Sequence, residues 1–309
     1  MCIRDRFELT GTLRLPGGPG PYPALIVVSG SGGQTRTSAP TYSPVQTAFA
    51  DAGFAVYSWD KPGSGQSTGA FDPERELRQR AQILAEGIRT LTDHPAIDST
   101  SIGLWGISQA GWVMPMALEL TEDVAFMISV SGGGEDSIEQ TMFQVSERLG
   151  CGGLPREQVE LVEQWGSQVA KGETYALYVE AMEVLLTIPG TEQYIGNEIA
   201  PEDEWQPWPP EIDAYFDPMT VIENATIPVL AIFGENDKAV DPIQGADAYE
   251  RALQQAGNPD YHVELIPGVG HTMENQETGC SGEVRRGVSE RYRKLIHEWA
   301  VKLAAMAAG

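Results

Sequence analysis

Short apolar runs alternate with amphipathic stretches along most of the chain. The run at 24–28 is apolar throughout, which is typical of a strand covered on both faces of a sheet. Further strands are expected at 54–59, 102–105, 124–130, 227–233 and 261–266. Helices are expected between them, at 42–53, 73–94, 109–120, 242–256 and 287–306. This alternation predicts a doubly wound, mostly parallel sheet with helices on both faces.

Two regions depart from this rhythm. Residues 7–15 alternate apolar and polar positions around Gly11, which predicts an antiparallel edge hairpin or a bent strand. Residues 131–216 contain no buried-strand pattern, but several helical stretches and then a segment rich in tryptophan and proline. We therefore expect a core domain made of 7–133 and 217–309, and a helical cap inserted at 134–216.

The first six residues, Met-Cys-Ile-Arg-Asp-Arg, do not fit the start of such a domain. They resemble translated adapter sequence of the kind seen in metagenomic assemblies, so residues 1–6 are interpreted as a non-native leader. The segment has no apolar core like that of a signal peptide. Loss of a natural signal peptide stays open, and a cytoplasmic location is favoured over secretion.

Composition narrows the possible partners. The 309 residues carry a formal charge of −24, which argues against a nucleic-acid partner, because phosphate binding needs a basic surface. No apolar run approaches the ~20 residues that a membrane-spanning helix needs. The three cysteines give neither a disulfide framework nor metal-ligand spacing. Free thiols are the favoured interpretation, with pairing of Cys151 and Cys280 left open, and the oligomeric state is not indicated.

The turn between the strand at 102–105 and the helix at 109–120 carries the strongest chemical signal. It reads Gly106-Ile107-Ser108-Gln109-Ala110-Gly111, with small residues two positions before and after a serine. Small side chains allow a sharp turn from strand into helix, which would expose the Ser108 hydroxyl in front of the helix N-terminus.

This turn resembles the nucleophile elbow of the α/β-hydrolase superfamily, Gly-x-Ser-x-Gly, with Ala110 replacing the second glycine. The nearest likeness is to bacterial esterases related to serine aminopeptidases and dienelactone hydrolases. The resemblance implies an α/β-hydrolase fold with an eight-stranded sheet and a cap inserted after the sixth strand. It also implies the chain order nucleophile, acid, histidine, without a metal or an organic cofactor.

A serine nucleophile needs a base, and the base needs an orienting acid. Of the two histidines that follow the last predicted strand, His271 lies in a loop just beyond it, whereas His297 lies within an amphipathic helix. For the acid, the resemblance favours Asp237, in the pattern Gly-x-x-Asp-x-x-Val. Asp241 is better placed as the N-cap of the next helix, and Glu235 would substitute only if the loop were shifted.

The resemblance also implies an oxyanion hole, made by the backbone N–H groups of Gln109 and of Ser31, with Gly32 as the second choice for the latter. Asp60 opens a segment, 60–69, that resembles Asp-x-x-Gly-x-Gly-x-Ser of many bacterial α/β-hydrolases. We interpret that segment as architectural, with Asp60 bonded to backbone donors.

The expected function is hydrolysis of a small-molecule carboxylic ester by Ser108, His271 and Asp237 through an acyl-enzyme. A thioesterase or an aminopeptidase using the same residues stays open, as does a non-catalytic receptor that binds a small molecule. Trp205 and Trp208 either line the substrate pocket, together with Gly32, or pack the cap onto the core. The acidic composition predicts poor turnover of anionic substrates.

Overall fold

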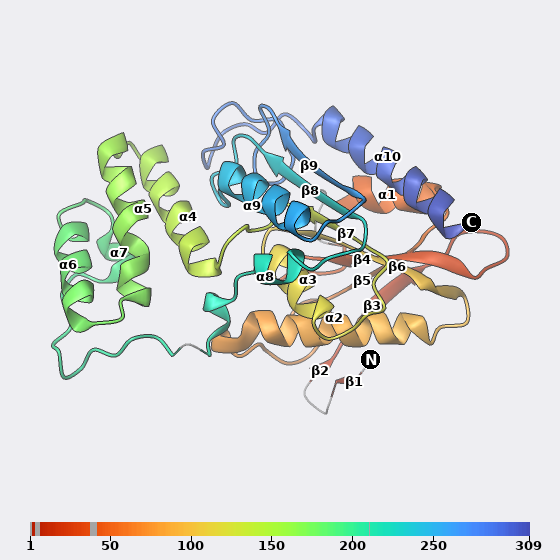
Figure 1. The fold of residues 1–309 in the computed structure, drawn as a ribbon, viewed down its shortest axis with the longest axis horizontal. Coiled ribbons are helices and arrows are strands. Elements are labelled where there is room, and N and C mark those ends of the chain that lie inside the picture. Colours follow the sequence, from red (N-terminus) through yellow and green to blue (C-terminus); the bar gives the residue numbers. More distant parts are fainter. Residues whose placement is uncertain (1, 4–6, 38–41, 210) are drawn as a thin grey trace.

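A seven-stranded sheet of order β3-β5-β4-β6-β7-β8-β9 forms the centre of the computed structural model (Figure 1). The structure describes residues 2–3, 7–37, 42–209 and 211–309. The strands of the sheet are β3 (Gly11–Arg14), β4 (Tyr22–Val28), β5 (Ala55–Trp59), β6 (Ile97–Ile107), β7 (Phe126–Val130), β8 (Val229–Gly234) and β9 (Tyr261–Ile266). All neighbouring pairs are parallel except β3 with β5.

Helices cover both faces of this sheet, as predicted. On one face lie α1 (Ser43–Asp51) and α10 (Glu290–Ala307), whose side chains form one apolar core with the sheet. The other face packs against α2 (Glu76–Thr92), α3 (Ala110–Leu118), α8 (Met219–Ile222) and α9 (Pro242–Gln255), and forms a second core. Both cores are continuous with apolar residues of the central strands, which explains why those strands are apolar throughout.

The expected eight-stranded sheet is a wrong prediction in one detail, because the described sheet has seven strands. The chain before β3 forms β2 (Phe7–Glu8), which pairs with β1 (Cys2–Ile3) in a separate two-stranded ladder instead of extending the sheet edge. The insertion accordingly follows β7, the fifth strand of the sheet in chain order, and not a sixth strand. Of the predicted leader, residues 1 and 4–6 lie outside the described residues.

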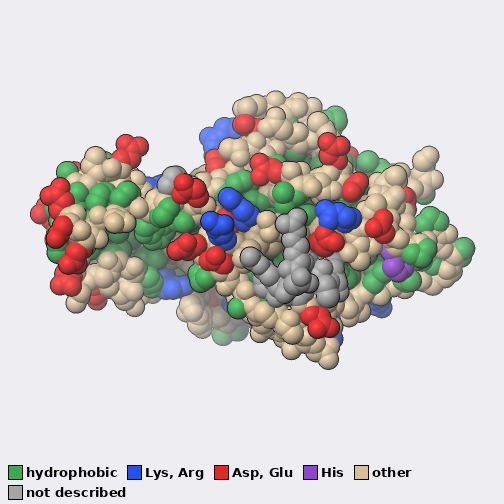
Figure 2. Space-filling model, turned by 90° about the horizontal axis from the view of Figure 1, so that it is seen from below, with side chains coloured by type: hydrophobic (Ala, Val, Ile, Leu, Met, Phe, Trp, Pro, Cys, Tyr) green, Lys and Arg blue, Asp and Glu red, His purple; other side chains and the backbone are tan. Residues whose placement is uncertain are grey.

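Residues between β7 and β8 form a helical insertion that projects from one end of the sheet (Figure 1). Its helices are α4 (Ser137–Cys151), α5 (Arg156–Lys171), α6 (Tyr175–Leu185) and α7 (Glu192–Ile195). Val145, Val162 and Leu185 form a small apolar core of its own. On the face shown in Figure 2, acidic side chains are spread over this insertion, at the left. No helix in the described part of the chain is long and apolar enough to span a membrane.

Cys151 and Cys280 form a disulfide, so the preference for free thiols was wrong. Cys151 ends α4, whereas Cys280 lies in the long loop between β9 and α10. The two residues are 129 positions apart in sequence. They meet because the C-terminal end of α4 lies next to that loop. The disulfide therefore joins the helical insertion covalently to the core.

We expect removal of this disulfide to destabilise the fold. Closing a loop of this length restricts the unfolded chain, and loss of such a bond typically costs about 2–5 kcal/mol. The Cys151→Ser/Cys280→Ser variant should lose this amount in the free energy of unfolding measured with urea. Dithiothreitol should destabilise the wild type equally and leave the variant unchanged; an effect of dithiothreitol on the variant would contradict the assignment.

Candidate active site

Ser108 lies on a strained turn at the carboxyl end of β6. Its φ is +58°, a left-handed conformation that costs a non-glycine residue about 1–3 kcal/mol. The turn is held by a 2.9 Å hydrogen bond from Ser108 N to the Val130 carbonyl, and by one of 2.8 Å from Gly111 N to the Ser108 carbonyl. Ser108 is half-buried, at the start of α3.

Small residues make this turn possible. A side-chain carbon on Gly106 would lie 2.6 Å from the Ala110 Cβ, and one on Gly111 would lie 2.4 Å from the Gly132 Cα. Both separations are shorter than real contacts allow. Because Gly106 already leaves room, the methyl group of Ala110 fits where the usual pattern has a second glycine.

Asp237 and His271 are hydrogen-bonded to each other. Asp237 follows β8, is 2% exposed, and its Oδ2 accepts a 2.8 Å hydrogen bond from His271 Nδ1. Its Oδ1 accepts hydrogen bonds from the amides of Ala239 (2.7 Å) and Val240 (3.0 Å). With Nδ1 donating to the carboxylate, Nε2 of His271 is left as the proton acceptor.

The competing acids have other hydrogen-bond partners, and the competing histidine lies on a distant helix. Asp241 caps α9 by accepting hydrogen bonds from the amides of Ile243 and Gln244, as predicted. Glu235 accepts a 3.0 Å hydrogen bond from the amide of Gly268, and His297 is exposed on α10.

Ser108 and His271 line two adjoining cavities. Ser108 lines a cavity of about 530 Å³, His271 lines one of about 480 Å³, and Gln144 and Ala239 line both. Within the described residues, no hydrogen bond joins the Ser108 hydroxyl to the His271 ring. The structure thus joins the predicted acid to the predicted base and leaves the predicted nucleophile and base without a hydrogen bond, as is common before substrate binds.

The predicted oxyanion donors lie beside Ser108. A side-chain carbon on Gly30 would lie 3.2 Å from the Ser108 Cβ, so the loop after β4 passes directly over the turn. Ser31 and Gln109 line the same cavity as Ser108. In the part of the chain that the structure describes, the backbone N–H groups of Ser31 and Gln109 donate no hydrogen bond.

Two buried cations, which the sequence analysis did not single out, hold this loop. Lys61, 3% exposed, donates to the carbonyls of Gly30 and Gly32. Arg80, 5% exposed, donates to the carbonyl of Ser29 and to Oε1 of Gln109.

The pKa of Lys61 is lowered to about 7, mainly by burial and in addition by the charge of Arg80, whereas Glu76 opposes the shift. Burial likewise lowers the pKa of Arg80, to about 10, again opposed by Glu76, so Arg80 stays protonated at neutral pH.

Of the three predicted pocket residues, Trp205, Trp208 and Gly32, only Trp208 lines the cavity of Ser108. This residue is 49% exposed. Trp205 instead packs against Tyr175 and Tyr178 inside the insertion. The carbonyl of Gly32 accepts a hydrogen bond from Lys61.

Asp60 is buried and accepts hydrogen bonds from the amides of Arg36 (2.8 Å) and Gln66 (2.9 Å), which agrees with an architectural role.

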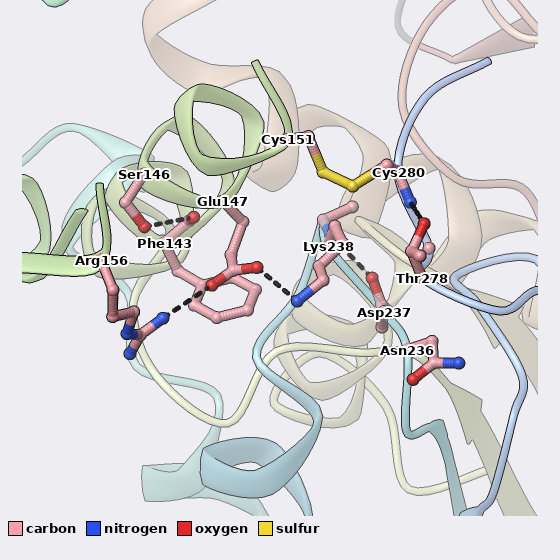
Figure 3. Close-up of polar contacts among 12 residues, drawn as sticks. Phe143, Ser146, Glu147, Cys151, Arg156, Asn236, Asp237, Lys238, Thr278 and Cys280 are labelled. Atoms are coloured by element: carbon pink, nitrogen blue, oxygen red, sulfur yellow. Dashed lines mark hydrogen bonds and ion pairs between the residues drawn. A yellow bond between two sulfur atoms is a disulfide. The ribbon is translucent and has the colours of Figure 1, made fainter. Parts of the chain in front are cut away.

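The insertion contacts the loops that carry Asp237 and His271 (Figure 3). Glu147 of α4 is ion-paired with Lys238, the residue after Asp237, and with Arg156, at 3.3 Å. The Cys151–Cys280 disulfide lies beside these ion pairs. The described residues contain no cluster of side chains suited to a metal ion.

The chain belongs to the alpha/beta hydrolase family, whose family model matches residues 25–278. Esterase FrsA of Escherichia fergusonii is 29% identical over 99 residues, which are 32% of this chain and 22% of FrsA. The chain thus spans about a fifth of the length of that relative.

Solved structures share the fold at lower identity. An esterase of Pyrococcus furiosus superposes with a TM-score of 0.57 at 14% identity, covering 96% of this chain and 92% of its own. Est1E of Butyrivibrio proteoclasticus, solved with ferulic acid, superposes with a TM-score of 0.56 at 17% identity, covering 98% and 96%. The fold is therefore that of an α/β-hydrolase, as the sequence predicted.

Asp237 should raise the pKa of His271. Desolvation lowers this pKa, but the charge and hydrogen bond of Asp237 outweigh it, with a small opposing effect of Arg285. We expect NMR titration of the histidine ring carbons to give His271 a pKa above the ordinary value of about 6.5. In Asp237→Asn the pKa should fall below that of the wild type. His271→Gln assigns the signal, and an unchanged pKa in Asp237→Asn would show that the pair does not form in solution.

Proposed function

We propose that this protein is a serine hydrolase that cleaves carboxylic esters with Ser108, His271 and Asp237. The observation that supports this most directly is the hydrogen bond between buried Asp237 and half-buried His271, beside a cavity that Ser108 lines from its strained turn. The esterases among the relatives and structural neighbours agree with this chemistry. The proposal requires a movement that brings His271 Nε2 to the Ser108 hydroxyl.

In the proposed first step, His271 Nε2 accepts the proton of Ser108 as its Oγ attacks the ester carbonyl carbon. Asp237 stabilises the imidazolium that forms. The carbonyl π electrons move to oxygen, and the N–H groups of Ser31 and Gln109 bind this oxyanion; one such donor contributes on the order of 3 kcal/mol. Collapse breaks the bond to the alcohol oxygen, which receives the proton from His271.

In the second step, water attacks the acyl-enzyme. His271 accepts a proton from water, the hydroxide oxygen bonds to the acyl carbon, and the second tetrahedral intermediate is held by the same donors. Its collapse releases the carboxylic acid and returns the proton to Ser108 Oγ. Both steps need neutral His271, so activity should decline as pH falls below the pKa of this residue.

We assign residues 134–216 to a cap that shapes the substrate cavity. The wall on the side of α4 is polar, with Ser137, Gln140, Thr141 and Gln144. The rest of the lining includes apolar Leu77, Trp208 and Ile212 and several acidic residues. A volume of about 530 Å³ suits a ligand of moderate size. An ester that carries both apolar and neutral polar groups therefore fits this lining.

Loss of the nucleophile tests the proposal directly. Wild type should hydrolyse p-nitrophenyl esters and react with a fluorophosphonate probe, whereas Ser108→Ala should do neither, since alanine has no hydroxyl. Ser131→Ala is the matched control, because Ser131 also follows a sheet strand and also has a positive φ but lies outside the cavity lining.

Two experimental outcomes would favour a different function for this protein. Folded wild type that does not react with the probe would favour a small-molecule receptor. Faster turnover of an acyl-CoA or of an aminoacyl anilide than of every ester would identify a thioesterase or an aminopeptidase.

The charge of the cavity predicts its substrate preference. Glu74, Glu76 and Asp213 line it, and none of the described lining residues is Lys or Arg. Repulsion over about 10 Å at an effective dielectric constant near 20 disfavours an anion by roughly tenfold. We expect kcat/KM for a succinate monoester to be lower by about this factor than for the matched neutral butyrate.

Glu74→Gln should reduce the difference in kcat/KM between the succinate monoester and the neutral butyrate, because it removes one negative charge from the cavity lining. The exposed Glu298→Gln on α10 should not, and serves as the control. Faster turnover of the succinate monoester would contradict the predicted preference.

A further inference from the structure

We propose that Lys61 and Arg80 are positioning residues that together fix the two halves of the oxyanion hole. This inference rests on the proposed function. Lys61 follows β5, and Arg80 lies on α2. Both side chains donate hydrogen bonds to backbone carbonyls of the loop 29–32, which follows β4. The two side chains are almost fully buried, in a chain with few basic residues.

Lys61 orients the first donor. The carbonyl of Gly30 and the N–H of Ser31 belong to one peptide unit, and in a trans peptide these two groups point in opposite directions. Lys61 Nζ holds that carbonyl, and at 2.9 Å also holds the carbonyl of Gly32. The Ser31 N–H is thereby directed away from Lys61, and a cation at the carbonyl also strengthens the N–H as a donor.

Arg80 links this loop to the second donor. One of its guanidinium nitrogens binds the Ser29 carbonyl, and another binds Oε1 of Gln109, the residue whose backbone N–H is the other donor. The planar guanidinium has its N–H groups at fixed angles, so it sets the position of the loop relative to the start of α3. Ser29 and Gln109 belong to different turns, and Arg80 bonds to both.

The contacts explain how these cations are tolerated in the interior. A buried charge is costly unless it is hydrogen-bonded, and each cation binds two oxygen acceptors. A neutral amine at position 61 would still have two N–H groups for its two carbonyls, so this contact does not depend on the protonation of Lys61.

The test compares binding of a transition-state analogue with binding of a ground-state analogue. A trifluoromethyl ketone adds to Ser108 and forms an oxyanion, whereas the matched methyl ketone occupies the cavity without forming it. In Lys61→Met, kcat should fall by about 10- to 100-fold with KM changed less than about threefold. The inhibition constant of the trifluoromethyl ketone should rise in proportion, and that of the methyl ketone should not.

Arg80→Lys should give the same pattern, because one ammonium cannot reproduce the fork of the guanidinium. Lys302→Met is the control: Lys302 is ion-paired with Asp260 and packs on Trp299 of α10, outside the lining of the cavity. Its kinetics should match the wild type. Gln109→Met provides a milder variant that keeps the backbone N–H and removes only the acceptor of Arg80, so the experiment does not depend on folding of the charge variants.

Unchanged selectivity for the trifluoromethyl ketone in folded Lys61→Met, or in Gln109→Met if Lys61→Met does not fold, would overturn the proposal. An equal rise in both inhibition constants would show a purely structural role and would overturn it as well. Failure of the proposed function is distinguishable, because the wild type would then neither hydrolyse esters nor bind the fluoroketone covalently.

Discussion

Parallel pairing of the central strands is the constraint on which the site depends. Because β4, β6, β7, β8 and β9 all run in one direction, their carboxyl ends meet at one edge of the sheet. Ser31, Ser108, Asp237 and His271 each follow one of these strands. Segments far apart in sequence are thus brought together by backbone hydrogen bonds alone, before any side chain of the site makes a contact.

Close packing at this edge then stabilises an unfavourable turn. Ser108 adopts a positive φ, and two glycines of the same turn, Gly106 and Gly111, lie too close to other residues for an ordinary side chain. The strain of about 1–3 kcal/mol is offset by the buried strand before it and the buried helix after it. The position of the Ser108 hydroxyl in the cavity lining is therefore a consequence of rigid surroundings rather than of a flexible loop.

The sequence predicted those parts of the structure that depend on local pattern. Central strands are covered on both faces, so their apolar runs identified them, and the spacing of small residues identified the turn at Ser108. The edge of the sheet was less predictable, because β2 pairs outside the sheet although its pattern suits a strand in either place. Pairing of Cys151 with Cys280 depends on the orientation of the helical insertion, which no local pattern encodes.

The same reasoning applies to the site. His271 could be ranked by its loop position and Asp237 by the family resemblance, and the two are hydrogen-bonded in the structure. Whether Ser108 and His271 are hydrogen-bonded depends on loop conformation and on the contacts of α4, and the spacing of these residues in the sequence could not predict it. Lys61 and Arg80 were missed because their partners are backbone carbonyls and one amide oxygen, and burial of a cation among such acceptors leaves no mark on the surrounding residues.

Because Lys61 and Arg80 are buried beside the site, the electrostatic potential there differs from what the net charge of the molecule suggests. The chain carries −24 overall, which would disfavour an oxyanion if every charge acted equally. Exposed carboxylates are screened by water and, at physiological salt, over about 8 Å, whereas buried charges are screened much less. Lys61 and Arg80 donate hydrogen bonds to the loop 29–32 and to Gln109, so two buried basic groups lie close to both proposed oxyanion donors. The net charge of the molecule therefore does not by itself describe the electrostatics at the proposed oxyanion hole.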